Sequence, residues 1–238
     1  MSIISRIKPR LWMLRSLIQT IYFNFHYLPF EQAIHLPIVL YKPKLKAMKG
    51  KVIFEGKPKM GQVQLGRHIV PLYPNSGFVF ENQGGTIIFR GECVMGGGSA
   101  VSVGEYGTLD IGNRFVVTAF MRLVAYNSVK IGEKCRFAWE TIVMDTDLHK
   151  LKKVKGGYSR GVGKIVLGDG CWVATRCMLQ KGTVLPNHTT VQAYSVVNRD
   201  FSDIPECSII GTSSEIKVKT TGLYRDIDDD VIDFSSIK

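Results

Sequence analysis

The sequence lacks the features that mark membrane-spanning, disulfide-linked and metal-centred proteins. No stretch of its 238 residues approaches the roughly 20 apolar residues that span a bilayer. Its five cysteines form no CxxC pair, and an odd count suits neither a disulfide framework nor a zinc cluster. No small-residue cleavage site follows the basic N-terminal segment. We therefore expect a cytoplasmic protein with small, buried cysteine side chains and no metal.

Motifs for binding nucleotides and nucleic acids are also missing. Gly96-Gly97-Gly98 lacks the following Lys-Ser/Thr of a P-loop and is better explained as a tight turn. The formal charge of +11 favours an anionic partner. Because the chain carries no motif of a known nucleic-acid-binding module, we expect that partner to be a phosphate-rich ligand or an anionic glycan lipid.

Residues 1–50 differ from the rest in having few glycines and many large apolar side chains. After Pro9, apolar residues recur at helical spacing: Leu11, Leu14, Ile18, Ile21 and Tyr22. Most amphipathic helices bury such a face, which favours an arm packed against the main domain or a sister subunit. A basic helix lying on the inner surface of the membrane is the alternative, since Arg10 and Arg15 lie opposite the apolar residues.

The middle of the chain instead has aliphatic residues at every sixth position. One set is Leu167, Val173, Leu179, Leu185, Val191 and Val197; others are Ile111, Val117, Leu123 and Val129, and then Ile131, Phe137 and Val143. Neither an isolated helix nor a simple alternating hairpin sustains a period of six. A coil with three flat sides does, and stacked coils would bury one continuous apolar column. We therefore predict an all-β fold, a parallel β-helix of hexapeptide repeats over residues 51–211.

Two further segments complete the predicted organisation. A polar stretch at about residues 145–164 interrupts the repeat and is expected to form an excursion loop outside the coil. After the last repeats, residues 212–238 are expected to form a C-terminal tail or a covering strand. Glycines such as Gly112, Gly132 and Gly168 are expected where the backbone turns sharply between sides.

The segment Ile165-Val-Leu-Gly-Asp-Gly-Cys-Trp-Val-Ala174 resembles the hexapeptide-repeat acyltransferases, as do residues 179–184 and 193–200. A second segment, Phe137-Ala-Trp-Glu-Thr-Ile-Val-Met-Asp-Thr-Asp-Leu-His149, resembles the Asp-x-Asp-x-His run of the polysaccharide-type O-acetyltransferases. The resemblance covers roughly residues 85–217. It implies a left-handed β-helix and a homotrimer with its sites between subunits. The implied reaction is acetyl transfer from acetyl-CoA to a hydroxyl of a sugar in capsule, exopolysaccharide or O-antigen biosynthesis.

The same resemblance assigns the catalytic residues. His149 fits the general base, because neutral imidazole can accept the proton of a sugar hydroxyl near pH 7. Asp145 or Asp147 would orient the imidazole and stabilise its cation, and Asp147 is preferred. Trp139 would either stack on the acceptor sugar or pack between subunits.

The donor positions also carry over from the family. They are Trp172, Thr175, Ala193, Asn198, Arg199 and Lys217. Trp172 and Thr175 match the coil along the pantetheine arm, and the Thr175 amide would stabilise the developing oxyanion. Arg199 and Lys217 would bind the phosphates, although solvated surface cations are equally consistent. The family usually has glycine where Tyr194 stands, so the groove there is expected to differ.

Of three alternatives to an O-acetyltransferase, one stays open and two are disfavoured. An N-acetyltransferase acting on an amino sugar nucleotide would use the same scaffold and donor. A non-enzymatic β-helix subunit would have no reason to keep Asp-x-Asp-x-His on an excursion loop. A zinc enzyme of the γ-carbonic anhydrase type needs three converging histidines, and the five histidines of this chain include no close pair.

Overall fold

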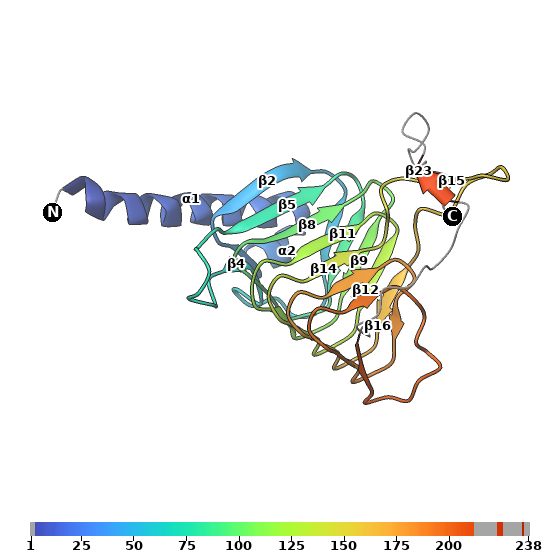
Figure 1. Cartoon of the computed structure of the whole chain (residues 1–238). Helices are drawn as coiled ribbons and strands as arrows, with labels where there is room; N and C mark the ends of the chain where they lie inside the picture. The colour runs from blue at the N-terminus through green and yellow to red at the C-terminus, as the bar shows by residue number, and fades with distance from the viewer. Residues whose placement is uncertain (1–2, 212–222, 226–234, 236–238) are drawn as a thin grey trace.

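The structure is a computed structural model that describes residues 3–211, 223–225 and 235 (Figure 1). Most of these residues form a prism with three faces, each a parallel sheet. Face A consists of β1 (Ile38–Leu40), β4 (Val63–Arg67), β7 (Cys93–Gly96), β10 (Phe115–Val117), β13 (Arg136–Phe137), β17 (Trp172–Val173), β20 (Thr190–Val191) and β22 (Ile209–Ile210). Face B consists of β2 (Pro43–Met48), β5 (Phe78–Asn82), β8 (Ser99–Val103), β11 (Arg122–Ala125), β14 (Ile142–Met144), β18 (Met178–Gln180) and β21 (Val196–Val197).

Face C closes the prism with β3 (Lys51–Phe54), β6 (Thr86–Phe89), β9 (Thr108–Ile111), β12 (Ser128–Ile131), β16 (Ile165–Leu167) and β19 (Val184–Leu185). The chain visits faces A, B and C in turn, so each strand pairs with the strand one coil later. Two helices, α1 (Ile3–Tyr27) and α2 (Phe30–Ala33), precede the first coil. Outside the prism, β15 (Leu151–Lys153) and β23 (Leu223–Arg225) form an antiparallel pair. The predicted parallel β-helix is confirmed.

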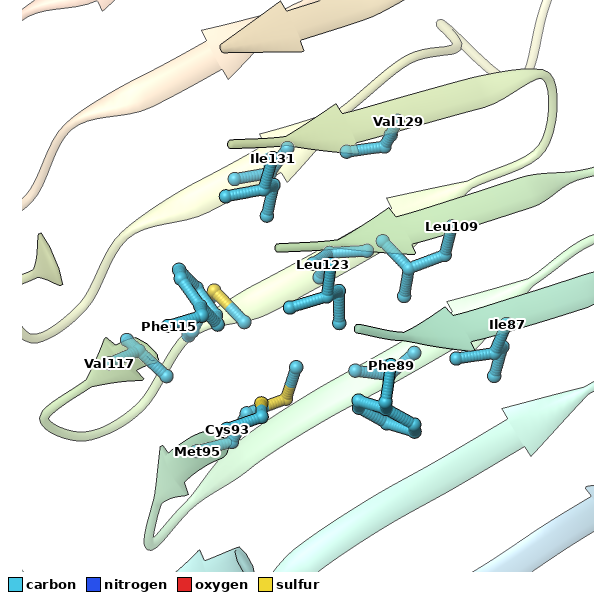
Figure 2. Close-up of a cluster of buried hydrophobic side chains, with 14 of the residues drawn as sticks. Ile87, Phe89, Cys93, Met95, Leu109, Phe115, Val117, Leu123, Val129 and Ile131 are labelled. Atoms are coloured by element: carbon cyan, nitrogen blue, oxygen red, sulfur yellow. The ribbon is translucent and has the colours of Figure 1, made fainter. Parts of the chain in front are cut away.

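The six-residue period has the predicted physical cause. Every member of the set from Leu167 to Val197 is at most 3% exposed and points into the prism. Val173 pairs with Val191, and Leu179 pairs with Val197, so one coil takes 191 − 173 = 18 residues. Figure 2 shows the corresponding side chains of the middle coils meeting between the sheets. The interior is therefore a single apolar column.

The six-residue pattern shifts by two residues between Val129, which ends one set, and Ile131, which begins the next, and this shift also has a structural explanation. Val129 and Ile131 lie on the same strand, β12, and both are buried, because alternate residues of a strand share one face. Ile131 pairs with Ile111, so this coil takes 131 − 111 = 20 residues. The earlier coils thus have longer circuits than the later ones.

Glycines at the junction of faces C and A are required by close stacking of the coils. A Cβ atom added at Gly112 would lie 2.4 Å from the backbone carbon of Gly132. One added at Gly132 would lie 2.5 Å from the equivalent atom of Gly168. The left-handed backbone conformation comes two residues later, at Arg114 and Lys134. The predicted sharp turn is present, but these glycines serve contact between coils and leave the positive φ to other residues.

The prism begins earlier than the predicted boundary at residue 51. Residues 38–40 pair with residues 63–65, and residues 43–48 pair with residues 78–82, so both segments belong to the first coil. The expected arm of residues 1–50 is therefore too long, and the part before the prism ends near Pro37. Irregular connections such as residues 55–62 interrupt the early coils and hide their period in the sequence.

Helix α1 packs on the prism through a row of polar residues and through the buried ring of Phe23, which lies 4.9 Å from that of Phe80. The strand amides at this end donate to helix side chains in three pairs: Lys42 to Ser16 (3.0 Å), Leu40 to Thr20 (3.0 Å) and Ile38 to Asn24 (3.2 Å). Four helical residues rise about 6 Å, and two strand residues advance about 6.6 Å, so the two spacings match. The helix thereby satisfies the edge strand β1, whose unpaired amides could otherwise pair with another chain.

The predicted apolar face of this helix is exposed instead of buried. Leu14 and Ile18 are each 59% exposed, whereas Ser16, Thr20 and Asn24 are at most 7% exposed. The arm therefore packs on the main domain, but through the opposite face to the one predicted. Among the described residues, no helix combines the length and hydropathy that a bilayer crossing requires.

The cysteines behave as small apolar side chains in four of five positions. Cys93, Cys135, Cys171 and Cys177 are buried and unbridged, and Cys207 is exposed. Burial raises the pKa of Cys93, which keeps its side chain as a neutral thiol.

Candidate functional site

The excursion loop leaves the prism at the junction of faces B and C, here called the BC corner. The chain departs after β14 and returns at β16. At its base the Asp147 amide donates to the Gly161 carbonyl (2.8 Å), and the Gly163 amide donates to the Asp145 carbonyl (3.0 Å). Figure 1 shows the loop and β15 standing outside the prism beside β23. The predicted loop is thus a projection with a hydrogen-bonded base.

Asp145 fixes the start of this loop to the preceding coil. Its side chain is fully buried, and its two carboxylate oxygens accept the amides of Tyr126 (2.8 Å) and Asn127 (2.8 Å). Burial raises its pKa, and the amide hydrogen bonds oppose that rise. The carboxylate is therefore used in closing the BC corner.

Asp147, the other predicted partner of His149, is held from the next coil. Lys181 forms an ion pair with the Asp147 carboxylate and also donates to the Arg160 carbonyl (3.2 Å). One lysine thus connects both strands of the loop base to the BC corner. His149 follows two residues later, half-buried. The general base proposed from the sequence consequently sits on an anchored loop.

Three other predicted residues stack at the junction of faces A and B, here called the AB corner. Trp139, Thr175 and Ala193 occupy equivalent positions in successive coils. The Thr175 hydroxyl donates to the Trp139 carbonyl (3.0 Å), and the Tyr194 amide donates to the Thr175 carbonyl (3.1 Å). The structure therefore brings the predicted acceptor residue and two donor residues together on one edge.

Next to these residues runs a polar ladder that the sequence did not reveal. Glu140, Arg176 and Tyr194 all have positive φ at this corner. Arg176 forms an ion pair with Glu140 and donates to the Tyr194 hydroxyl (2.7 Å), while the Tyr73 hydroxyl donates to Glu140 (2.8 Å). Arg176, followed by Tyr73, lowers the pKa of Glu140. The ring of Tyr73 also lies 6.3 Å from that of Trp139 and helps to cover the corner.

Tyr73 reaches the AB corner from a second loop, residues 68–77, between β4 and β5. No pattern in the sequence indicates that residue 73 meets residues 139 and 140. The only sequence signal is that residues 68–77 do not continue the six-residue repeat of apolar side chains. The family usually has glycine where Tyr194 stands, and in this chain the Tyr194 hydroxyl accepts a hydrogen bond from Arg176 in the polar ladder.

Trp172 lies on the outer surface of face A, where its side chain is 53% exposed. Its register neighbours are Arg136 on one side and Thr190 on the other. Residues 174 and 175 follow directly toward the AB corner. An exposed indole at this position is a surface on which an extended, partly apolar ligand can lie.

The remaining donor residues do not join this group. Asn198 and Arg199 follow β21 at the BC corner, which is also the corner from which the loop with His149 projects. The Arg199 guanidinium lies 4.2 Å from the centre of the Phe201 ring. Lys217 lies outside the described residues.

Face B separates the two groups within one chain. Arg176 at the AB corner and Gly182 at the BC corner are six residues apart along the chain, with β18 between them, which limits their separation to at most about 20 Å. The loop that carries His149 is anchored at one end of this span, whereas Thr175 lies at the other. Within one chain, the two groups of candidate residues therefore lie at different corners of the prism.

No protein-family model and no curated protein matches the chain. Among solved structures, the chain is similar to the polySia-specific acetyltransferase NeuO, with a TM-score of 0.43 and 17% sequence identity. The alignment covers 78% of this chain and 70% of that one. Values this low do not transfer residue roles from that enzyme to this chain.

Proposed function

We propose that this protein is an acyltransferase that moves an acetyl group from acetyl-CoA to a hydroxyl of a sugar in cell-surface polysaccharide biosynthesis. The supporting observation is the placement of His149 on an anchored loop at one corner of the prism. The AB corner, with Thr175 and Ala193, and the exposed Trp172 on the adjoining face A offer an edge suited to the donor. The proposed acceptor is a glycan or a sugar intermediate in the cytoplasm.

We further propose that the active unit is a homotrimer in which the BC corner of one copy faces the AB corner of the next. His149, Asn198 and Arg199 would then come from one chain, and Trp172 and Thr175 from its neighbour. This arrangement accounts for a predicted site whose parts lie at different corners of the prism in one chain. Heterologous contacts that close after three copies leave each site equivalent.

The residues fit a coenzyme A thioester in their chemistry. Ala193 is exposed and small, Trp172 presents an exposed indole, and Arg199 is an exposed cation. Acetyl-CoA supplies the acyl thioester. His149 takes the proton of the acceptor hydroxyl, and the freed oxygen attacks the carbonyl carbon, so that a C–O bond forms and the C–S bond breaks. The imidazolium then returns its proton to the leaving sulfur.

Asp147 supports this role through position and charge. It stands two residues before His149 and is held by Lys181, so the base of the loop keeps its place during the proton transfers. The Asp145 carboxylate anchors the loop and is assigned no contact with the reacting atoms. Of the two acids, Asp147 is the one we propose to affect the imidazole.

Release of free coenzyme A thiol in the presence of acceptor tests the proposal. His149→Ala should lower turnover by about a hundredfold or more while keeping the thermal stabilisation by acetyl-CoA. His35→Ala, which changes an exposed histidine outside the prism, should leave turnover unchanged. Undiminished turnover in His149→Ala would remove the assigned base. Transfer to an amino sugar nucleotide alone would support the N-acetyltransferase, and absence of stabilisation by acetyl-CoA would support a non-enzymatic subunit.

A further inference from the structure

Helix α1 presents an exposed apolar face, here called the outer stripe. It comprises Leu14, Leu17, Ile18, Ile21, Tyr22 and Phe25, each between 41% and 59% exposed. At 100° per residue these positions cover an arc of about 140°, whose centre lies about 130° around the helix from the centre of Ser16, Thr20 and Asn24. The ring of Phe30 lies 6.1 Å from that of Phe25 and extends the stripe beyond the helix.

The outer stripe cannot turn toward the prism without breaking the junction of α1. Ser16, Thr20 and Asn24 accept three amides of the first coil, and Asn24 also donates to the Ile38 carbonyl (2.7 Å). Rolling the helix would leave these buried groups without hydrogen bonds, each at a cost of about 1–3 kcal/mol. The polar contacts therefore hold the apolar stripe outward.

The charge of this segment selects the kind of surface that covers the stripe. The first 30 residues contain Arg6, Lys8, Arg10 and Arg15 and no acidic residue; the first acid is Glu31. A second copy of α1 would offer these cations no counter-charge in either orientation. Anionic lipid headgroups would supply it, and the acyl region beneath them would accept the apolar side chains.

We propose that the outer stripe of α1 docks onto the surface of a bilayer that contains anionic lipids. The helix lies in the plane of the interface, with aliphatic and aromatic side chains among the acyl chains and basic residues among the headgroups. Tyr22, with an apolar ring and a polar hydroxyl, suits this depth. The hydrogen-bonded face of the helix stays on the prism, so membrane docking requires no refolding.

Vesicle flotation of the full chain tests this proposal. The chain should float with vesicles that mix phosphatidylcholine and phosphatidylglycerol, and much less with phosphatidylcholine alone. Raising the salt concentration should weaken the binding, because headgroup attraction is screened. Equal flotation on both kinds of vesicle would overturn the assignment of anionic lipid.

Two substitutions separate the apolar and the charged contributions. Ile18→Asp should lower partitioning by at least about tenfold, since it removes a large apolar side chain from the interface and adds a charge. Arg15→Glu should lower it by about tenfold on anionic vesicles only. Leu72→Asp is the matched control, because Leu72 is an 85% exposed leucine that lies outside α1, in the loop of residues 68–77, and the variant should float like the original chain.

Light scattering distinguishes a membrane from a second copy. If Ile18→Asp lowers the molecular mass in solution while the original chain floats with no vesicle, the stripe is an interface between copies and the proposal is wrong. If Ile18→Asp floats as well as the original chain, the stripe has no role in docking. Ile18→Asp and Arg15→Glu both change exposed side chains of α1, so both variants should keep the original melting temperature, as measured by circular dichroism. Acetyl transfer to a soluble acceptor should not change, so failure here leaves the proposed function intact.

Discussion

Replacing Asn24 with alanine should weaken the junction between α1 and the first coil. The Asn24 side chain is fully buried, and its amide bridges one residue of the edge strand. Its oxygen accepts the Ile38 amide (3.2 Å), and its nitrogen donates to the Ile38 carbonyl (2.7 Å). Ile38 is itself fully buried, so water cannot easily replace the lost partner.

The expected cost follows from these two contacts. A buried backbone group that loses its partner costs about 1–3 kcal/mol, and Asn24→Ala affects one amide and one carbonyl. The change should therefore lower the stability of the junction by about 2–6 kcal/mol. Because contacts in a stacked-coil protein are mainly between neighbours, the loss should be local to the first coil and α1.

Hydrogen exchange at the Ile38 amide measures this directly. Exchange should accelerate by about a hundredfold in Asn24→Ala, which corresponds to roughly 2.7 kcal/mol, while amides of the middle coils keep their rates. Gln19→Ala provides the control, because Gln19 is half-exposed on the same helix. An unchanged Ile38 rate would refute the idea that α1 is held by polar pairing with the edge strand.

Three further changes test the prism and the AB corner. Leu123→Ala removes a fully buried side chain from the column and should lower the free energy of unfolding by about 2–5 kcal/mol in chemical denaturation. Gly50→Ala should cost at least about 2 kcal/mol, since φ is +65° and the new Cβ would lie 2.2 Å from a carbonyl oxygen; Gly56→Ala, with φ of +97° and open space, should show only the backbone strain. Arg176→Ala should raise the pKa of Glu140 toward its ordinary value, as followed by carboxyl NMR titration. A carboxyl whose pKa is lower in the folded than in the unfolded state stabilises the protein above its unfolded pKa, and this stability is lost as the pH falls through its folded pKa. Since Arg176→Ala removes the main cause of the low Glu140 pKa, the variant should lose less stability on acidification than the original chain.

The inward residues of the prism could be predicted because their spacing is a local property of the repeat. Leu167 and Val173 fill the same apolar column as their equivalents one coil later, Leu185 and Val191, and this does not depend on the conformation of the loops. The start of the prism at Ile38 could not be found this way, because irregular connections separate the early strands. Sequence periodicity located the coils but not their number.

The orientation of α1 shows a different limit. The helical spacing of Leu14 and Ile18 identified an apolar face, and burial of such a face is the usual outcome. Here Ser16, Thr20 and Asn24 match the spacing of the outward-facing amides of Ile38, Leu40 and Lys42, and that match depends on a tertiary partner. Helical periodicity groups residues on one side without specifying which side meets the protein.

The positions of the candidate residues in the prism could be predicted only in part. Equivalent coil positions placed Thr175 and Ala193 on one corner, as expected from the eighteen-residue turn. Tyr73 and Glu140 were missed because their contact joins segments 67 residues apart. The family resemblance assigned Arg199 to the same donor site as Thr175, whereas within one chain face B of the prism separates the two residues.

The most direct test of the proposed shared site mixes two inactive variants within one assembly. His149→Ala removes the base, and Thr175→Trp fills the AB corner, so each variant alone should lack transfer. Coexpressed in equal amounts, they should recover about one quarter of the original activity, because random trimers pair an intact base with an intact corner at about one quarter of the interfaces. Activity that stays at the level of the separate variants would contradict a site built from two chains.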